Sequence, residues 1–153
     1  MNITLCAVGR LRSGPELDLF ETYIQRLPWK VDVCEIEVKE AVSQKKKNLI
    51  ECEQLAAKVP QRAKVICLDS RGNVLSSEAV ADSMGKWRDS GVRDLCIVIG
   101  GADGLDEHLL QRADMVLSFG AVTWPHMLMR VLLAEQLFRW HCILTDHPYH
   151  RGH

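Results

Sequence analysis

The chain has 153 residues, of which 47% are hydrophobic and 25% are charged, and its formal net charge is −1. These values are typical of a globular protein with a single domain, here residues 1–153, and they exclude disordered and fibrous classes. No apolar run approaches the roughly 20 residues that span a bilayer, and the first residues lack the basic start of a secretion signal. We therefore expect a cytoplasmic protein with no membrane segment.

The near-neutral charge also bears on partners, because proteins that bind nucleic acid through phosphate contacts alone are usually strongly basic. A nucleic-acid partner would have to be recognised through a local patch or a shaped site. The six cysteines include no pair at CxxC spacing. The pattern therefore indicates neither a zinc ribbon nor a redox motif.

Apolar runs alternate with helix-period segments over the first half of the chain. The expected elements are a strand at 3–8, a helix opened by Ser13-Gly14-Pro15, a strand at 31–38, a helix capped by Ser43 and a strand at 64–69. The inner face predicted for the second helix is Leu49, Cys52, Ala56 and Val59. A turn at Arg71-Gly72-Asn73 should follow the third strand.

The second half of the chain continues this alternation. It predicts a helix capped near Ser76 or Ser77 and ended by Gly91, a buried strand at 95–99, a short helix at 106–112, a strand at 116–119 and a long helix at about 125–140. The alternation predicts an α/β fold with a mainly parallel sheet and helices on both faces. The last helix is apolar nearly all round, which favours burial on two sides and a homodimer contact.

Two segments that follow strands are candidates for a ligand site, since ligands of α/β sheets bind beyond the carboxyl ends of the strands. In Ile99-Gly100-Gly101-Ala102-Asp103-Gly104, glycines would let the backbone approach a ligand, although a simple turn explains them equally well. In Leu117–His126, a loop of small and apolar residues offers backbone groups that suit adenine and ribose, and Thr123 can cap the next helix.

The C-terminal tail, residues 141–153, holds four of the six histidines and Arg151. Its basic character suits phosphate, and Tyr149 offers a ring on which a base can stack. The alternative is a frayed terminus. His147, His150 and His153 recur at intervals of three, but no carboxylate or cysteine stands at a matching spacing, so we expect no metal site.

Together these segments resemble one known family. The similar segments are Ile99-Gly100-Gly101-Ala102-Asp103-Gly104-Leu105, Thr123-Trp124-Pro125-His126, Arg130-Val131-Leu132-Leu133-Ala134-Glu135-Gln136-Leu137 and His147-Pro148-Tyr149-His150. They resemble motifs of the RlmH (YbeA-like) methyltransferases of the SPOUT class, over essentially the whole chain. The resemblance implies an S-adenosyl-L-methionine cofactor, a homodimer, a C-terminal trefoil knot, and methylation of N3 of a pseudouridine in helix 69 of 23S ribosomal RNA. The knot cannot be derived from the residues, because general connection rules disfavour threading.

The resemblance also implies which residues form the site. Carried over by position, the cofactor contacts would come from Leu68, Gly100, Phe119, Gly120, Ala121, Val122, Thr123 and Trp124. Since Gly120-Ala121-Val122 departs from the family's side chains, the contacts there should be mainly backbone.

The tail is expected to face the substrate. The methyl group of a sulfonium is already activated, so the enzyme needs positioning more than a covalent nucleophile. The N3 proton must leave, which requires a base or cationic stabilisation of the developing anion. Our hypothesis gives this role to Tyr149, His150 and Arg151, supported by His147 and Arg139, beside the cofactor of the other subunit.

Two other functions compete with this hypothesis. A nucleotide-binding α/β oxidoreductase would explain the glycine turn, but the GxGxxG fingerprint is absent. A non-catalytic ribosome-associated RNA-binding dimer would explain the tail, but not the retention of the cofactor loops. We therefore expect 23S rRNA, the large ribosomal subunit or the whole ribosome as the partner.

Overall fold

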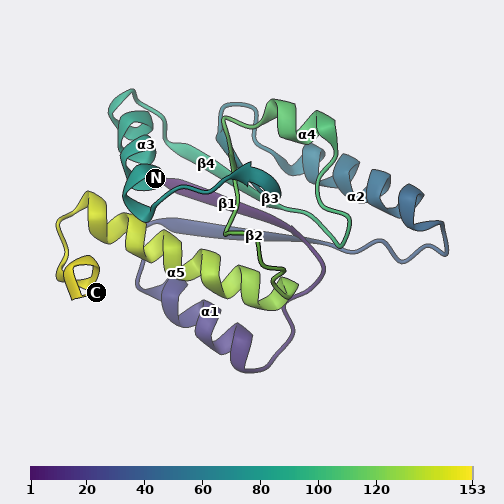
Figure 1. The fold of residues 1–153 in the computed structure, drawn as a ribbon, viewed down its shortest axis with the longest axis horizontal. Helices are drawn as coiled ribbons and strands as arrows, with labels where there is room; N and C mark the ends of the chain where they lie inside the picture. Colours follow the sequence, from purple (N-terminus) through teal and green to yellow (C-terminus); the bar gives the residue numbers. More distant parts are fainter. Residues whose placement is uncertain (153) are drawn as a thin grey trace. The chain divides into compact units, whose positions relative to one another are not determined.

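A computed structural model of the protein describes residues 1–152 and contains one five-stranded sheet (Figure 1). Its order is β2-β1-β4-β3-β5, and all strands run parallel. The strands are β1 (Asn2–Val8), β2 (Lys30–Ile36), β3 (Lys64–Asn73), β4 (Asp94–Ile99) and β5 (Met115–Leu117). The central β4 is buried from Leu95 to Ile99, as its uninterrupted apolar run predicts. The expected parallel α/β sheet is thus confirmed.

The chain divides into two units, each made of three segments. The first unit comprises Met1–Arg10, Val31–Val74 and Val92–Val122, and the second comprises Leu11–Lys30, Leu75–Gly91 and the chain from Thr123 onward. The sheet lies in the first unit with α2 (Gln44–Lys58) and α4 (Glu107–Arg112), whereas the second unit contains α1 (Pro15–Gln25), α3 (Ser77–Asp89), α5 (His126–Leu144) and the 3-10 helix η1 (Pro148–Gly152).

The core of the first unit lies between the sheet, α2 and α4. Its buried side chains include Cys6, Cys67, Cys96 and Val98 from the strands, Cys52, Leu55 and Val59 from and just after α2, and Leu105 and Leu109 at α4. Ser43 caps α2 as predicted, by accepting a hydrogen bond from the backbone N–H of Lys46. The prediction that Leu49 faces inward is wrong, because 48% of this residue is exposed. Asn48 and Glu51 occupy the inward face instead, and polar residues at those positions conceal it from an apolar pattern.

The predicted turn at residues 71–73 is also wrong, because β3 continues to Asn73. Leu68 and Asn73 both pair with Leu117 of β5, so the residues between them form an irregularity in the register. The carboxylate of Asp69 accepts a hydrogen bond from the backbone N–H of Arg71 within this segment. The polar residues resemble a turn in the sequence, but they form a bulge within a longer strand.

In the second unit, α5 packs beside α1 and α3 (Figure 1). Helix α3 begins after Ser76, whose hydroxyl accepts from the N–H of Ala79, and its chain reverses at Gly91, where φ is 91°. The prediction that Thr123 caps the last helix is wrong, because α5 has Pro125 as its N-cap and no side-chain cap. Among the described residues no helix is both long and apolar enough to cross a membrane. The trefoil knot and helices on both sheet faces stay predictions.

Candidate functional site

In the first unit, the carboxyl ends of three neighbouring strands bring together several of the predicted cofactor residues. Leu68 of β3 pairs with Ile99 of β4, which immediately precedes Gly100. Leu68 also pairs with Leu117 of β5, two residues before Phe119. Parallel strands end at the same edge of the sheet, so this edge matches the place where α/β proteins bind their ligands.

The backbone after β5 is open at Gly120. The N–H of Ser118 donates to the carbonyl of Asn73 (2.9 Å), and the Ser118 hydroxyl donates to the carbonyl of Gly120 (3.2 Å). Gly120 has a φ of 99°, and apart from Gly120 and its two chain neighbours no described residue has an atom within 4 Å of the position that a Cβ would occupy. Ala121 and Val122 are exposed. This loop therefore presents main-chain groups and small apolar side chains, which fit the adenine and ribose of S-adenosylmethionine.

The remaining predicted cofactor residues, Thr123 and Trp124, begin the last segment of the second unit. Both are exposed, and 37% of Trp124 is accessible to solvent. They precede α5 without capping it.

The glycine loop after β4 is surrounded by polar side chains that the sequence pattern did not single out. The Asp69 carboxylate, 2% exposed, binds Arg71 and the backbone N–H of Leu105. These hydrogen bonds, chiefly the one from the Arg71 side chain, lower the pKa of Asp69 to about 2. Asn48 donates to the carbonyl of Gly104. The only sequence signal was an acidic residue directly after an apolar strand.

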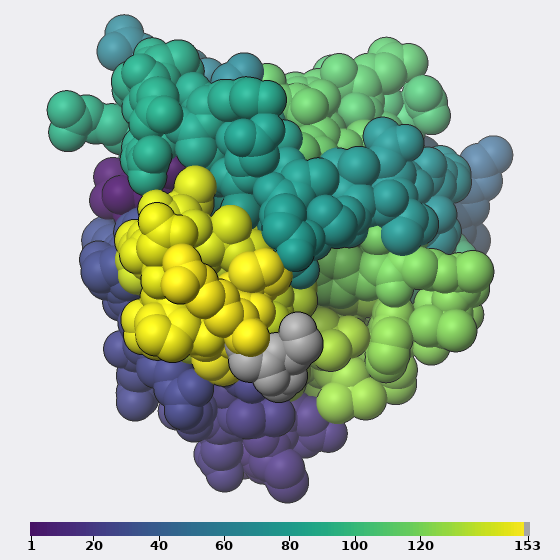
Figure 2. Space-filling model, turned by 60° about the vertical axis from the view of Figure 1, so that its left-hand side comes forward, coloured from purple at the N-terminus to yellow at the C-terminus, as the bar shows by residue number. Residues whose placement is uncertain are grey.

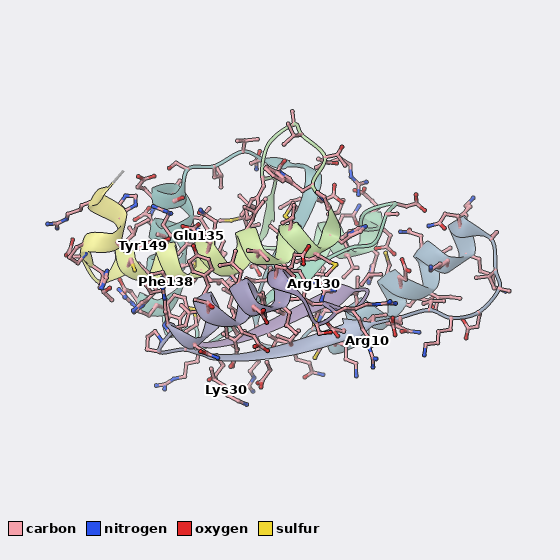
Figure 3. All side chains as sticks on the ribbon, turned by 90° about the horizontal axis from the view of Figure 1, so that it is seen from below. Arg10, Lys30, Arg130, Glu135, Phe138 and Tyr149 are labelled. Atoms are coloured by element: carbon pink, nitrogen blue, oxygen red, sulfur yellow. The ribbon has the colours of Figure 1, made fainter. Side chains whose placement is uncertain are left out.

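In the second unit, Tyr149 and Arg139 of the predicted substrate-facing set meet at Glu135. Figure 3 labels Tyr149, Glu135 and the neighbouring Phe138. The Tyr149 hydroxyl donates to Oε1 of Glu135 (3.0 Å), and the Arg139 guanidinium donates to the same oxygen (2.6 Å). The Tyr149 ring packs edge-on against Phe138, with 4.8 Å between centroids. Burial, followed by hydrogen bonding, raises the pKa of Tyr149 well above its usual value, so the phenol stays neutral. Glu135 was missed as a site residue, although it stands four residues before Arg139 on the helix.

The other tail residues are partly held. His150 Nε2 lies 3.0 Å from Oε1 of Glu78 at the start of α3, and His147 Nδ1 accepts from the N–H of Tyr149 (3.1 Å). The side chain of Arg151 is 72% exposed and lies 3.5 Å from Asp146. Figure 2 shows the tail (yellow) at the molecular surface. The alternative of a frayed terminus is wrong for residues 148–152, which form η1.

The described residues contain no group of three histidine, cysteine or acidic side chains able to hold a metal ion. His153, the last of the three spaced histidines, lies outside the described residues. All six cysteines are free thiols, and five of them are buried. The predicted cofactor residues thus lie mainly at the sheet edge, and the predicted substrate-facing residues lie in the tail and at Arg139.

A family model described as "Predicted SPOUT methyltransferase" matches residues 1–150. Among curated relatives, the "Ribosomal RNA large subunit methyltransferase H" of Rhodospirillum centenum is 49% identical over 152 residues, which cover 99% of this chain and 100% of that one. The protein of the same name from Paramagnetospirillum magneticum is 47% identical and covers 99% of each chain. The chain belongs to the ribosomal RNA large subunit methyltransferase H family. Members of this family are S-adenosylmethionine-dependent SPOUT methyltransferases.

Solved structures agree with this family at the level of the fold. A probable methylase family protein from Haemophilus influenzae is similar with a TM-score of 0.57 at 12% identity, covering 96% of this chain and 69% of that one. The tRNA (m1G37) methyltransferase from Aquifex aeolicus is similar with a TM-score of 0.51 at 14% identity, covering 91% of this chain and 70% of that one. Membership in the methyltransferase family excludes the oxidoreductase alternative.

Proposed function

We propose that this protein transfers a methyl group from S-adenosylmethionine to N3 of a pseudouridine in helix 69 of 23S rRNA, in the cytoplasm and on the assembled ribosome. In this proposal residues 1–153 act as one SPOUT methyltransferase domain. The observation that carries it is the sheet edge where Leu68 of β3 pairs with Ile99 and Leu117, the last residues of the strands that lead to Gly100 and Phe119. The curated relatives of this chain are named as large-subunit rRNA methyltransferases.

The cofactor would be held mainly by backbone groups. The proposed contacts are Leu68, Gly100, Phe119, Gly120, Ala121, Val122, Thr123 and Trp124. When bound, S-adenosylmethionine supplies a methyl group already activated by its sulfonium. The protein therefore has to orient the reactants and exclude water, and it needs no covalent nucleophile. The left-handed backbone at Gly120 supports this role, because the space beside its Cα is open and a ligand can approach the main chain there.

The tail would contact the pseudouridine ring that receives the methyl group. The N3 proton would pass to solvent water, and a cation near that nitrogen would stabilise the negative charge left on the ring. Arg151 is exposed and suits this role, whereas the neutral phenol of Tyr149, oriented by Glu135 beside Arg139, suits hydrogen bonding or stacking. His150 and His147 complete the proposed substrate-facing set.

We further propose that the protein is a homodimer in which each tail serves the partner subunit's cofactor. Exposed apolar side chains at the start of the second unit's last segment support an association surface: Trp124 is 37% exposed and Leu128 is 42% exposed. Leu19 of α1 is 46% exposed as well. Contact with a second subunit would bury these exposed apolar side chains.

Methyl incorporation from labelled S-adenosylmethionine tests the proposed function. We expect transfer into ribosomes from a strain lacking this methylation, with the label mapped to N3 of a helix 69 pseudouridine, and weaker transfer into free 23S rRNA. Ribosomes that already carry the modification are the control and should accept no label. Cofactor binding without incorporation into either substrate would contradict the proposal and favour a non-catalytic RNA-binding dimer.

A further inference from the structure

We infer that Asn48, Asp69 and Arg71, here called the loop clamp, are positioning residues that hold Gly100–Leu105 in its cofactor-binding form. The inference deepens the proposed function and rests on it, since it concerns the same cofactor. None of the three belongs to the cofactor contacts proposed above. All three lie in the first unit with the loop that they hold.

Asp69 is the centre of the loop clamp. Its Oδ1 accepts hydrogen bonds from Nε and the backbone N–H of Arg71, at 2.7 and 3.0 Å. Its Oδ2 accepts from Nη2 of Arg71 at 2.8 Å and from the backbone N–H of Leu105 at 3.1 Å. The same Arg71 nitrogen also donates to the carbonyl of Leu105 at 2.5 Å. One buried carboxylate and its bidentate arginine thus bind both backbone groups of Leu105.

Residues of helix α2 also restrain the loop. Asn48 donates from Nδ2 to the carbonyl of Gly104 at 3.0 Å. Oε2 of the buried Glu51 lies 2.7 Å from the position that a Cβ on Gly101 would occupy. The loop therefore has little freedom to shift towards α2.

These contacts join two of the proposed cofactor residues. Asp69 directly follows Leu68 on β3, and the loop directly follows Gly100 after β4. A Cβ on Gly100 would lie 2.8 Å from the backbone of Gly104, so the two ends of the loop are already in close contact. A loop fixed before the cofactor arrives loses less conformational entropy on binding, and affinity rises accordingly.

A purely structural role is the competing explanation, and the same strand offers a matched control. At the amino end of β3, the Asp114 carboxylate accepts from Lys64 Nζ at 2.6 Å and from the backbone N–H of Val65 at 2.8 Å. Asp114 therefore resembles Asp69 in chemistry, since each binds one basic side chain and backbone N–H groups, one at Asp114 and two at Asp69. It lies at the opposite end of β3 from the proposed cofactor edge.

The test compares Asp69→Asn with Asp114→Asn in the full-length protein. The Asp69→Asn amide keeps the size of the side chain but turns an NH₂ group towards donors. We expect the dissociation constant for S-adenosylmethionine, measured by titration calorimetry, to rise about tenfold in Asp69→Asn and to stay unchanged in Asp114→Asn. In the methylation assay, Asp69→Asn should raise KM for the cofactor while kcat at saturation stays near wild type.

If Asp69→Asn does not fold, Arg71→Gln and Asn48→Ala test the inference in its place, because both variants keep the Asp69 carboxylate. Each should weaken cofactor binding and speed amide hydrogen exchange in residues 101–105. Folded variants of the loop clamp that bind the cofactor as the wild type does would overturn the inference, and so would an equal loss in Asp114→Asn. A wild-type protein that does not bind the cofactor would instead contradict the proposed function.

Discussion

At the scale of single residues, the stabilising contribution of Asp69 depends on its protonation state. Asp69 is almost fully buried, with a side chain 2% exposed, and its hydrogen bonds to Arg71 and Leu105 lower its pKa from 3.8 to about 2. In the unfolded chain the same carboxyl titrates near its ordinary value. The folded state therefore holds Asp69 ionised at a pH where the unfolded chain has already bound a proton.

This difference predicts an acid-dependent loss of stability. Asp69 contributes about 2 kcal/mol of stability above its unfolded pKa, and this contribution is lost as pH falls from about 4 to about 2. Urea unfolding between pH 7 and pH 2 should show this extra loss in the wild type and not in Asp69→Asn. Asp82→Asn removes an exposed carboxylate, 65% accessible, and should follow the wild type. Parallel curves for wild type and Asp69→Asn would contradict the assignment.

The sequence was sufficient to predict the site residues that are recognised by their position at the end of a strand. Leu68 lies near the end of an expected apolar strand, and Gly100 and Phe119 lie at or just after the ends of two others. The rule that ligands bind beyond strand ends points to that edge. Asn48, Asp69 and Glu135 were missed because each acts through a partner on another element or another turn. A carboxylate that binds a backbone N–H 36 positions away leaves no trace in local periodicity.

Among elements, β3 shows how local signals and structure can disagree. Ser43, Ser76 and Asp106 cap helices through their own side chains, and such caps can be predicted from the residue type alone. The segment at 71–73 contains turn residues, yet it pairs with β5. Pairing with a distant strand overrides local preference, which is why the longer strand was not predicted.

Gly72 tests the importance of this extension. A Cβ at Gly72 would lie 2.7 Å from backbone atoms of Val116 and Leu117, and backbone cannot move as a flexible side chain does. We expect Gly72→Ala to lower the free energy of unfolding by about 1–3 kcal/mol in urea titrations. Cofactor affinity should fall as well, because β5 leads directly into the loop at Ser118.

Asn73→Ala is the matched control on the same strand. Asn73 is exposed, and its backbone carbonyl, which accepts from Ser118, is retained in the variant. This variant should keep both stability and cofactor affinity. A Gly72→Ala protein as stable as Asn73→Ala would show that β3 and β5 separate readily at this point.

For the whole molecule, the proposed dimer predicts complementation between two inactive variants. Gly100→Ala places a methyl group 2.8 Å from the backbone of Gly104 and should disable the cofactor loop. The double variant Tyr149→Phe with His150→Ala should disable the tail. If each tail serves the partner subunit's cofactor, heterodimers formed by mixing contain one intact site, and a random mixture should regain about a quarter of wild-type activity.

The methylation assay on separately refolded and co-refolded variants measures this recovery. A mixture of two different tail variants is the control and should stay inactive. No recovery in the mixture of loop and tail variants would show that each site is built within one subunit.

The fold of the whole molecule was predictable to the level of its parallel sheet. Alternating strands and helices gave the parallel sheet, because periodicity reports which side chains are buried. The division into two units was not foreseen, since each is assembled from three separated segments. Periodicity along one segment carries no information about which distant segment it joins.

That interleaving has a genetic consequence. The chain passes from one unit to the other five times, after Arg10, Lys30, Val74, Gly91 and Val122. β1 pairs with β4, and Asn2 is the partner of Asp94, so β1 cannot complete its pairing until the chain has extended past residue 94. Pairing between such distant segments makes folding slow and cooperative. A premature stop codon anywhere before residue 123 removes α5 and leaves the second unit incomplete. Nonsense and frameshift alleles should therefore be null along nearly the entire gene, with no fragment that retains half of the function.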